Sequence, residues 1–143
     1  ANSFTGMMQM MDVDFVITHP KGYELNPEVV KDSTVIYDQE EALKDADFVY
    51  VKNWSSYSDY GKITNTDENW MITHEKLGEA KFMHCLPVRR NVIVEDAVLD
   101  SDHSLVIEQA NNRTFAAQVV LKQILETAQS GEILKSHKLT SHM

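Results

Sequence analysis

Strand-like and helix-like segments alternate along this chain, and the connections between them are short. Segments rich in β-branched and aromatic residues predict strands over Val13–Thr18, Thr34–Tyr37, Asp47–Lys52, Phe82–Leu86 and Ser104–Ile107. Helical spacing or helix-start residues predict helices over Ser3–Met11, from Asn26-Pro27-Glu28, from Asp38, over Thr73–Glu79 and over Asn112–Thr127. Alternating elements of this kind form a parallel sheet covered by helices. We therefore expect an α/β fold: a doubly wound, mostly parallel, Rossmann-like sheet with helices on both faces.

One domain is predicted over residues 1–127, followed by a mobile tail over residues 128–143, where the apolar periodicity is lost. The chain opens on a predicted helix without a preceding strand or linker, so we expect a partner domain to be missing. The five glycines, at positions 6, 22, 61, 78 and 131, include no G-x-G-x-x-G spacing. A dinucleotide site of the Rossmann type is therefore not expected.

Composition argues against several classes of partner. The formal net charge of −9 disfavours nucleic acid, whose phosphates attract clusters of Lys and Arg, and an anionic membrane surface. No run approaches the roughly 18 apolar residues of a membrane span, and the first residues lack the basic region of a secretory signal. The single cysteine, Cys85, has no internal partner, which fits a reducing cytoplasm. The six histidines are scattered without zinc-ligand spacing, so we expect neither a metal nor another cofactor.

The segment from Met83 to Asn91 concentrates the groups most useful for chemistry. It reads Met-His-Cys-Leu-Pro-Val-Arg-Arg-Asn and includes the end of a predicted strand. In open α/β sheets ligands bind beyond the carboxyl ends of the strands, so these groups would face a pocket. A cis Leu86-Pro87 bond would turn the carbonyls of Cys85 and Leu86 toward the amide protons of a ligand, whereas a trans bond would simply end the strand.

Each polar residue of this segment also has a plainer interpretation. His84 is either a site residue or a hydrogen-bonded core histidine. Cys85 by itself is more typical of a small buried hydrophobe than of a nucleophile, and no Cys-His-Asn pattern activates it. Arg89 and Arg90 either clamp carboxylates in bidentate fashion or lie solvated on a surface loop.

Two further segments follow predicted strands. Lys52, at the end of an apolar strand, would need a carboxylate partner because lysine is costly to bury. Trp54 and Tyr57 would either wall a pocket or serve packing alone. Arg113 follows the last predicted strand and opens the final predicted helix, which makes it a candidate for binding an anion.

Three separated motifs resemble those of the ornithine transcarbamylases. Phe82–Pro87 is similar to their H-C-L-P signature, Asn111-Asn112-Arg113 to their late (E)-N-R motif, and Ala1-Asn2-Ser3 to the N-S segment that opens their second domain. The order and separations also fit, and the resemblance runs from Ala1 to about Leu125. It implies the second, ornithine-binding domain of the transcarbamylase fold. The S-x-R-T-R and H-P-x-Q segments of the carbamoyl-phosphate-binding first domain do not occur here.

One position departs from that family pattern. Ornithine transcarbamylases carry D-x-W-x-S-M-G after the strand, and their Asp holds the free α-ammonium of ornithine; here the stretch begins with Lys52. A lysine repels an ammonium group but not an acylated, neutral nitrogen or an added carboxylate. With the Arg89-Arg90 pair, this resembles the bacterial N-acetylornithine and N-succinylornithine transcarbamylases. The acetyl-specific form carries a lysine where this chain has Ile93, which favours the succinyl substrate.

The resemblance implies roles for single residues. The backbone carbonyls of Cys85 and Leu86 would bind the carbamoyl amide, with the Leu86-Pro87 bond cis. His84 and Arg113 would hold carbamoyl phosphate or its developing oxyanion, and the acylornithine would contact Asn2, Lys52 and Arg89, with Trp54, Ser56 and Pro87 nearby. The δ-amine of N-succinylornithine or N-acetylornithine would attack the carbamoyl carbon, giving N-acylcitrulline and phosphate in arginine synthesis. Such catalysis works by positioning and oxyanion stabilisation, without a covalent enzyme intermediate.

The same resemblance implies a cytoplasmic homotrimer that shares its active sites through the first domain. Two alternatives stay open. One is a family member that carbamoylates another amine, such as free ornithine. The other is a non-catalytic binding domain of the same fold, because a fold alone does not determine a function.

The missing motifs generate a first prediction. Because neither the S-x-R-T-R nor the H-P-x-Q segment is present, the 143-residue chain alone should bind these ligands poorly and show no useful turnover. The measurement is a turnover assay with carbamoyl phosphate and N-succinylornithine, beside a full-length control. Activity close to that of the control would contradict the prediction.

Overall fold

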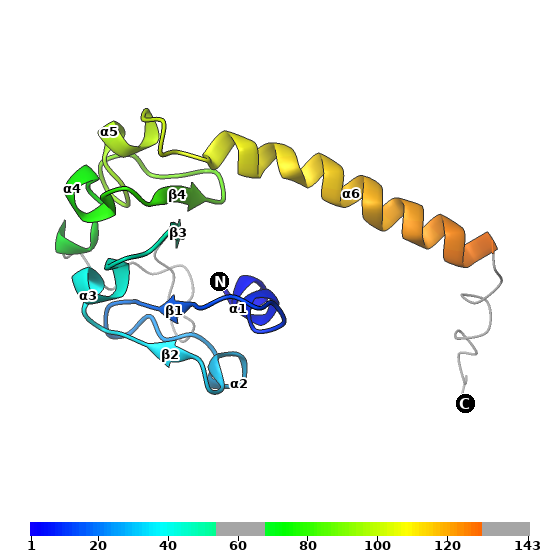
Figure 1. Cartoon of the computed structure of the whole chain (residues 1–143), viewed down its shortest axis with the longest axis horizontal. Helices are drawn as coiled ribbons and strands as arrows, with labels where there is room; N and C mark the ends of the chain where they lie inside the picture. Colours follow the sequence, from blue (N-terminus) through cyan, green and yellow to red (C-terminus); the bar gives the residue numbers. More distant parts are fainter. Residues whose placement is uncertain (54–67, 130–143) are drawn as a thin grey trace, which may run out of the picture. The chain divides into compact units, whose positions relative to one another are not determined.

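The computed structural model of the chain describes residues 1–53 and 68–129. The chain divides into two compact units, Ala1–Val106 and Ile107–Met143, and each is considered by itself. The strands of the described residues all belong to the first unit (Figure 1). In the second unit the structure describes residues 107–129, which belong to one long helix.

Parallel pairs of short strands organise the first unit. β1 (Val16–Ile17) pairs with β2 (Thr34–Val35), and β3 (Phe48–Val51) pairs with β4 (Lys81–His84). The remaining elements are α1 (Asn2–Met8), α2 (Pro27–Val30), α3 (Gln39–Leu43), η1 (Glu68–Trp70), α4 (His74–Leu77), α5 (Asp96–Leu99) and α6 (Val106–Gln129). A helix lies in the connection between the strands of each pair, as parallel neighbours require. The expected α/β class with parallel strands is confirmed. The four described strands form two sheets of two strands each.

Capping residues explain where the short helices begin. Asn26 accepts a hydrogen bond from the Glu28 backbone N–H at 3.0 Å, and Pro27 occupies the first helical position of α2, as predicted. Asp38 caps α3 in the same way, through the Glu41 N–H at 3.0 Å. Thr73 caps α4. Side-chain acceptors therefore begin these helices at the positions that the sequence indicates.

The predicted strand over Ser104–Ile107 is wrong. Ser104 forms only an isolated bridge to Phe82, and the chain enters α6 at Val106, six residues before the predicted start of the final helix. Two β-branched residues at the start of α6 suggested a strand, but their propensity is a weak preference that tertiary contacts override. The polar stretch that follows the predicted strand, Asn53 to Asp67, lies outside the described residues from position 54 on. The predicted tail, residues 128–143, lies outside them from position 130 on, but its first two residues, Ala128 and Gln129, belong to α6, so the prediction is wrong for these two.

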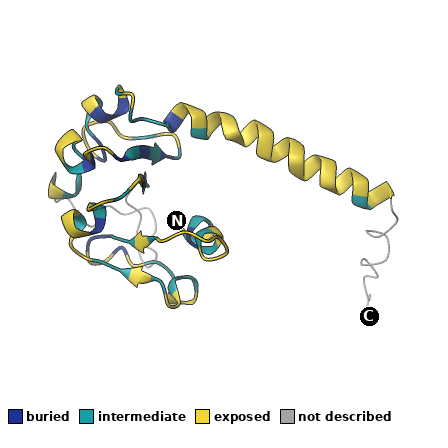
Figure 2. Ribbon diagram, in the orientation of Figure 1, coloured by how far each residue is buried: buried dark blue, intermediate teal, exposed yellow. Residues whose placement is uncertain are grey.

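The core of the first unit surrounds β4. Alternate residues of β4 are buried, and Phe82 and His84 are both 0% exposed. The buried residues packed with Phe82 are Val49, Ile72, Leu77, Ala80, Val94, Val98, Leu99 and Val106. Figure 2 shows this burial along β4 and in α5. Because side chains alternate across a strand, burying Phe82 on one face also brings His84 into the core.

The second unit is described by α6, which continues to Gln129. Large apolar side chains of this helix are exposed, among them Phe115 and Leu121. Figure 2 shows most of the helix in the colour of exposed residues. Within residues 1–53 and 68–129, no helix combines the length and the apolar character that crossing a membrane requires.

The core predicts effects of very different size for the replacement of two phenylalanines. Replacing Phe82, which is fully buried, by alanine should lower the free energy of unfolding by roughly 3–5 kcal/mol, because lost burial and a cavity add together. The matched control is Phe48→Ala on β3, where the side chain is 63% exposed, and its cost should stay within about 0.5 kcal/mol. Urea titrations of the three chains measure both, and equal costs would contradict this description of the core.

Candidate functional site

The candidate site lies where β3 and β4 end side by side. The parallel register pairs Tyr50 with Met83 and Val51 with His84. One residue further on, Lys52 and Cys85 leave the two strands at the same edge of the sheet. Lys52 is exposed and Cys85 is half-buried. The edge therefore offers a cation beside a thiol and its backbone carbonyl. Because Lys52 is exposed, the burial that would require a carboxylate partner does not arise.

Helix α1 brings the first residues of the chain to this edge. The ring of Phe4 stacks on Tyr50 of β3 with 4.2 Å between ring centroids. Ala1, which precedes α1, lies close enough to Lys52 and Cys85 for the charges of both side chains to act at its backbone nitrogen. Asn2, the first residue of α1, follows directly. The structure thus brings the predicted residues Asn2, Lys52 and Cys85 into one neighbourhood.

The turn after β4 is held by an asparagine. The Leu86-Pro87 peptide bond is cis, as predicted. The Asn53 side-chain amide donates a hydrogen bond to the Pro87 carbonyl at 3.0 Å, which ties the segment after β3 to the segment after β4. The Leu86, Pro87 and Arg89 side chains are exposed. Three predicted site residues therefore stand on a turn that solvent reaches.

His84 combines the two interpretations that its sequence context allowed. It is a core histidine, fully buried, and its Nδ1–H donates to the Cys85 carbonyl at 2.6 Å. A carbonyl can only accept, so Nδ1 carries the proton and Nε2 keeps its lone pair in the neutral ring. Nε2 is buried and has no hydrogen-bond partner among the described residues. Burial lowers the pKa of His84 below 6.5, the Cys85 hydrogen bond opposes this, and Lys52 adds to the lowering.

The two adjacent arginines have different surroundings. Arg89 is exposed, and in the described part of the chain its guanidinium makes no ion pair. Arg90 instead forms ion pairs with Asp96 and with Asp100, both at 2.7 Å. The expectation that both arginines add positive charge for a ligand is therefore wrong for Arg90, because two carboxylates of the same chain already surround its guanidinium.

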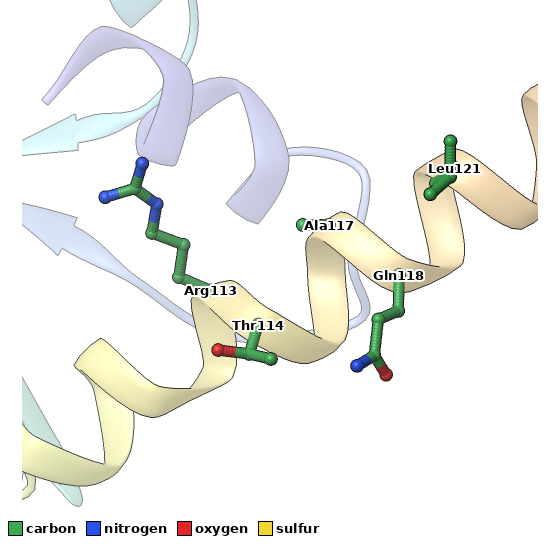
Figure 3. Close-up of a pocket in the computed structure, with 5 residues that line it drawn as sticks. All are labelled: Arg113, Thr114, Ala117, Gln118 and Leu121. Atoms are coloured by element: carbon green, nitrogen blue, oxygen red, sulfur yellow. The ribbon is translucent and has the colours of Figure 1, made fainter.

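Arg113 lies within α6, in the second unit. Because α6 begins at Val106, Arg113 is not at a helix N-terminus, and the prediction that it opens the final helix is wrong. The side chain is exposed and borders a shallow hollow along the helix, shown in Figure 3. The other lining residues are Thr114, Ala117, Gln118 and Leu121.

Two predicted residues, Trp54 and Ser56, lie outside the described residues, as does Tyr57. Asn53, by contrast, was not singled out from the sequence. Its Oδ1 is buried without a hydrogen-bond partner in the described residues, while its amide holds the Pro87 carbonyl. The available signal was its position directly after a predicted strand, beside Lys52. In residues 1–53 and 68–129, no three His, Cys, Asp or Glu side chains gather as a metal site would need.

Comparisons with known proteins agree on one family. The model of the aspartate/ornithine carbamoyltransferase family, Asp/Orn binding domain, matches residues 1–124. An N-succinylornithine carbamoyltransferase of Bacteroides fragilis (strain 638R) is 51% identical over 130 residues, which cover 87% of this chain and 41% of that relative. The chain thus spans about two fifths of the length of such relatives.

Solved structures give the same result. The crystal structure of an acetylornithine transcarbamylase complexed with acetylcitrulline matches with a TM-score of 0.70 and 28% identity, over 78% of this chain and 40% of that chain. A mutant N-acetyl-L-ornithine transcarbamylase complexed with carbamyl phosphate and N-succinyl-L-norvaline matches with a TM-score of 0.67 and 28% identity, over the same shares.

The environment of His84 predicts a pH dependence of stability. Its pKa is lower in the folded chain than in the unfolded chain, so unfolding takes up a proton between those two pKa values. The free energy of unfolding should therefore decline as the pH falls below about 6.5 and on through the folded pKa. Urea titrations between neutral and acidic pH measure this decline.

The variant His84→Asn tests the origin of that decline. Its amide can replace the Nδ1–H donor but does not titrate, so its stability should depend less steeply on pH than that of the wild type. His74→Asn, at an exposed histidine, is the control and should keep the wild-type slope. Parallel curves for His84→Asn and the wild type would show that burial of His84 does not cause the decline.

Proposed function

This chain belongs to the aspartate/ornithine carbamoyltransferase family, as its Asp/Orn-binding domain, and from this premise we propose that it is the substrate domain of an N-acylornithine carbamoyltransferase. The enzyme would transfer the carbamoyl group of carbamoyl phosphate to the δ-amine of N-succinyl-L-ornithine or N-acetyl-L-ornithine. The products would be N-acylcitrulline and phosphate, in arginine biosynthesis. The observation that carries the proposal is the exposed Lys52 beside Cys85 at the edge where β3 and β4 end.

The charge of Lys52 selects the acceptor amine. At a few ångströms an ammonium on the substrate would be repelled, and the repulsion grows as water is excluded from the site. Acylation makes the α-nitrogen neutral and removes that repulsion, while the α-carboxylate, or the second carboxylate of a succinyl group, gains an attraction. The name of the Bacteroides fragilis relative agrees with this assignment. Ile93 is 1% exposed, so its side chain belongs to the core and adds no charge for an acyl group.

The cis-proline turn would bind the carbamoyl group. The carbonyls of Cys85 and Leu86 would accept hydrogen bonds from the carbamoyl NH₂. A carbonyl has two lone pairs, so the hydrogen bond from His84 leaves the Cys85 oxygen able to accept another. His84 would act mainly through that carbonyl: it fixes the position of the oxygen, while its neutral ring adds no charge beside Lys52.

The remaining residues would complete the substrate site. Arg89 and Asn2 would contact the carboxylate and amide groups of the acylornithine, with Pro87, Trp54 and Ser56 forming nearby walls. Arg113 would hold the phosphate or the developing oxyanion. In the reaction, the lone pair of the δ-amine would form the new C–N bond, the C–O bond would break with its electron pair leaving on the phosphate, and the proton lost by the amine would pass to that phosphate. These side chains orient the two substrates, which is the main source of such rate enhancement.

The proposal extends to the assembly and location of the whole protein. We propose a cytoplasmic homotrimer. Within this chain the one cysteine, Cys85, is free, which fits a reducing compartment.

Reversing the charge at position 52 tests the proposed selectivity. In the complete protein that contains these residues, Lys52→Asp should lower kcat/KM for N-succinylornithine by at least roughly ten-fold and raise it for free ornithine, because removing one charge and adding the opposite one changes the attraction by more than about 1.4 kcal/mol. Lys44→Asp, at an exposed lysine after α3, makes the same charge change elsewhere and should leave the preference unaltered. An unchanged preference in Lys52→Asp would defeat the charge argument.

A substrate panel tests the function itself. We expect carbamoylation of N-succinylornithine to be fastest, N-acetylornithine to be slower and free ornithine to be a poor acceptor. Steady-state phosphate release with each amine measures this order. Preference for free ornithine would assign the protein to the other branch of the family, and the lack of turnover with every amine would favour a non-catalytic binding domain.

A further inference from the structure

A network of charged groups holds the chain just beyond the cis-proline turn. Nη1 and Nη2 of Arg90 donate to the two carboxylate oxygens of Asp100 at 3.0 and 2.7 Å, and Nη1 also donates to Asp96 at 2.7 Å. The contact with Asp100 is bidentate. Hydrogen bonds to both aspartates raise the pKa of Arg90 above its ordinary value and lower the pKa of Asp96 and of Asp100.

Asn91 connects this network to the backbone. Its side-chain amide donates to Asp96 at 2.8 Å, and its side-chain oxygen accepts from the Asp96 backbone N–H at 3.0 Å. Asn91 has a φ of 55°, which asparagine tolerates better than most residues, and its N–H donates to the Val94 carbonyl at 2.7 Å. The Ile93 N–H donates to the Arg89 carbonyl at 3.0 Å. The residues on the C-terminal side of Arg89 therefore have a defined conformation.

The N-terminal side of Arg89 is held as well. Asn53 binds the Pro87 carbonyl, and Val88 packs partly against the core. Arg89 thus stands between two anchored neighbours. Its own side chain is exposed, and its guanidinium has no ion pair in the described residues. Of two adjacent and chemically identical side chains, Arg90 is bound within the chain and Arg89 is available to a ligand.

We propose that Arg90 is a positioning residue: its bidentate contact with Asp100 and its bond to Asp96 fix the backbone that aims Arg89 at the carboxylate of the amine substrate. This inference rests on the proposed function and deepens it. An exposed ion pair adds little to stability on its own, so the consequence of this network lies in geometry. Only a planar guanidinium matches a carboxylate with two parallel hydrogen bonds, and lysine keeps the charge without that match.

The test is Arg90→Lys in the complete protein, assayed with both substrates varied. We expect the KM for N-succinylornithine to rise roughly ten-fold, with kcat and the KM for carbamoyl phosphate changed less than about two-fold, because only binding through Arg89 is disturbed. Asp100→Asn removes one carboxylate and should shift the same KM in the same direction by a smaller factor. Lys122→Gln, which breaks the exposed pair with Glu126 on α6, is the control and should change none of the three constants.

Two outcomes overturn the inference while the proposed function stands. One is an unchanged KM for N-succinylornithine in Arg90→Lys. The other is a fall in kcat alone, in proportion to the loss of folded protein, which would mean that Arg90 only stabilises the turn. The wild type in the same assay reports separately on the function: if it carbamoylates none of the three amines, the proposed function fails and the inference built on it falls too.

Discussion

The parallel register between β3 and β4 is the constraint on which the site depends. It pairs Val51 with His84, so the next residues, Lys52 and Cys85, emerge together. Burial of Phe82 on one face of β4 determines this register, because a slip of one residue would turn Phe82 and His84 out of the core. The packing of an apolar side chain in the middle of a strand thus decides which charged group stands beside the cis-proline turn.

His84 shows where packing and chemistry compete. An apolar residue at this fully buried position would avoid leaving a ring nitrogen without a hydrogen-bond partner among the described residues. It would also leave the Cys85 carbonyl without its Nδ1–H donor. An unsatisfied buried polar atom lowers stability by roughly 1–3 kcal/mol. His84 is the last residue of β4, next to the turn, where fixing one carbonyl oxygen matters most for the proposed reaction.

Local patterns predicted what depends on neighbouring residues in the sequence. The Asn26-Pro27 helix start and the strand that became β3 are confirmed. The cis bond before Pro87 is confirmed too, but the residues alone left it open, and it was the family resemblance that implied it. Errors arose where distant contacts decide the outcome. Val106 and Ile107 have β-branched side chains typical of a strand, yet they begin a long helix. Propensity is a weak preference. Pairing with β4 is limited to the two bonds that Phe82 makes to His103 and Leu105, and the chain enters α6 at Val106.

The arginine pair shows the same limit for function. The residue types and their spacing do not distinguish Arg89 from Arg90, because both are cations directly after the turn, and only the family resemblance selected Arg89. Asp96 and Asp100 lie one helical turn apart, so a single guanidinium can reach both carboxylates. The N–H donors of Arg90 are thereby used within the chain, and Arg89 and Lys52 keep the exposed positive charge beside the strand ends. The positive charge available to a substrate therefore comes from the side chains that make no ion pair within the chain. Only the three-dimensional structure shows which side chains these are.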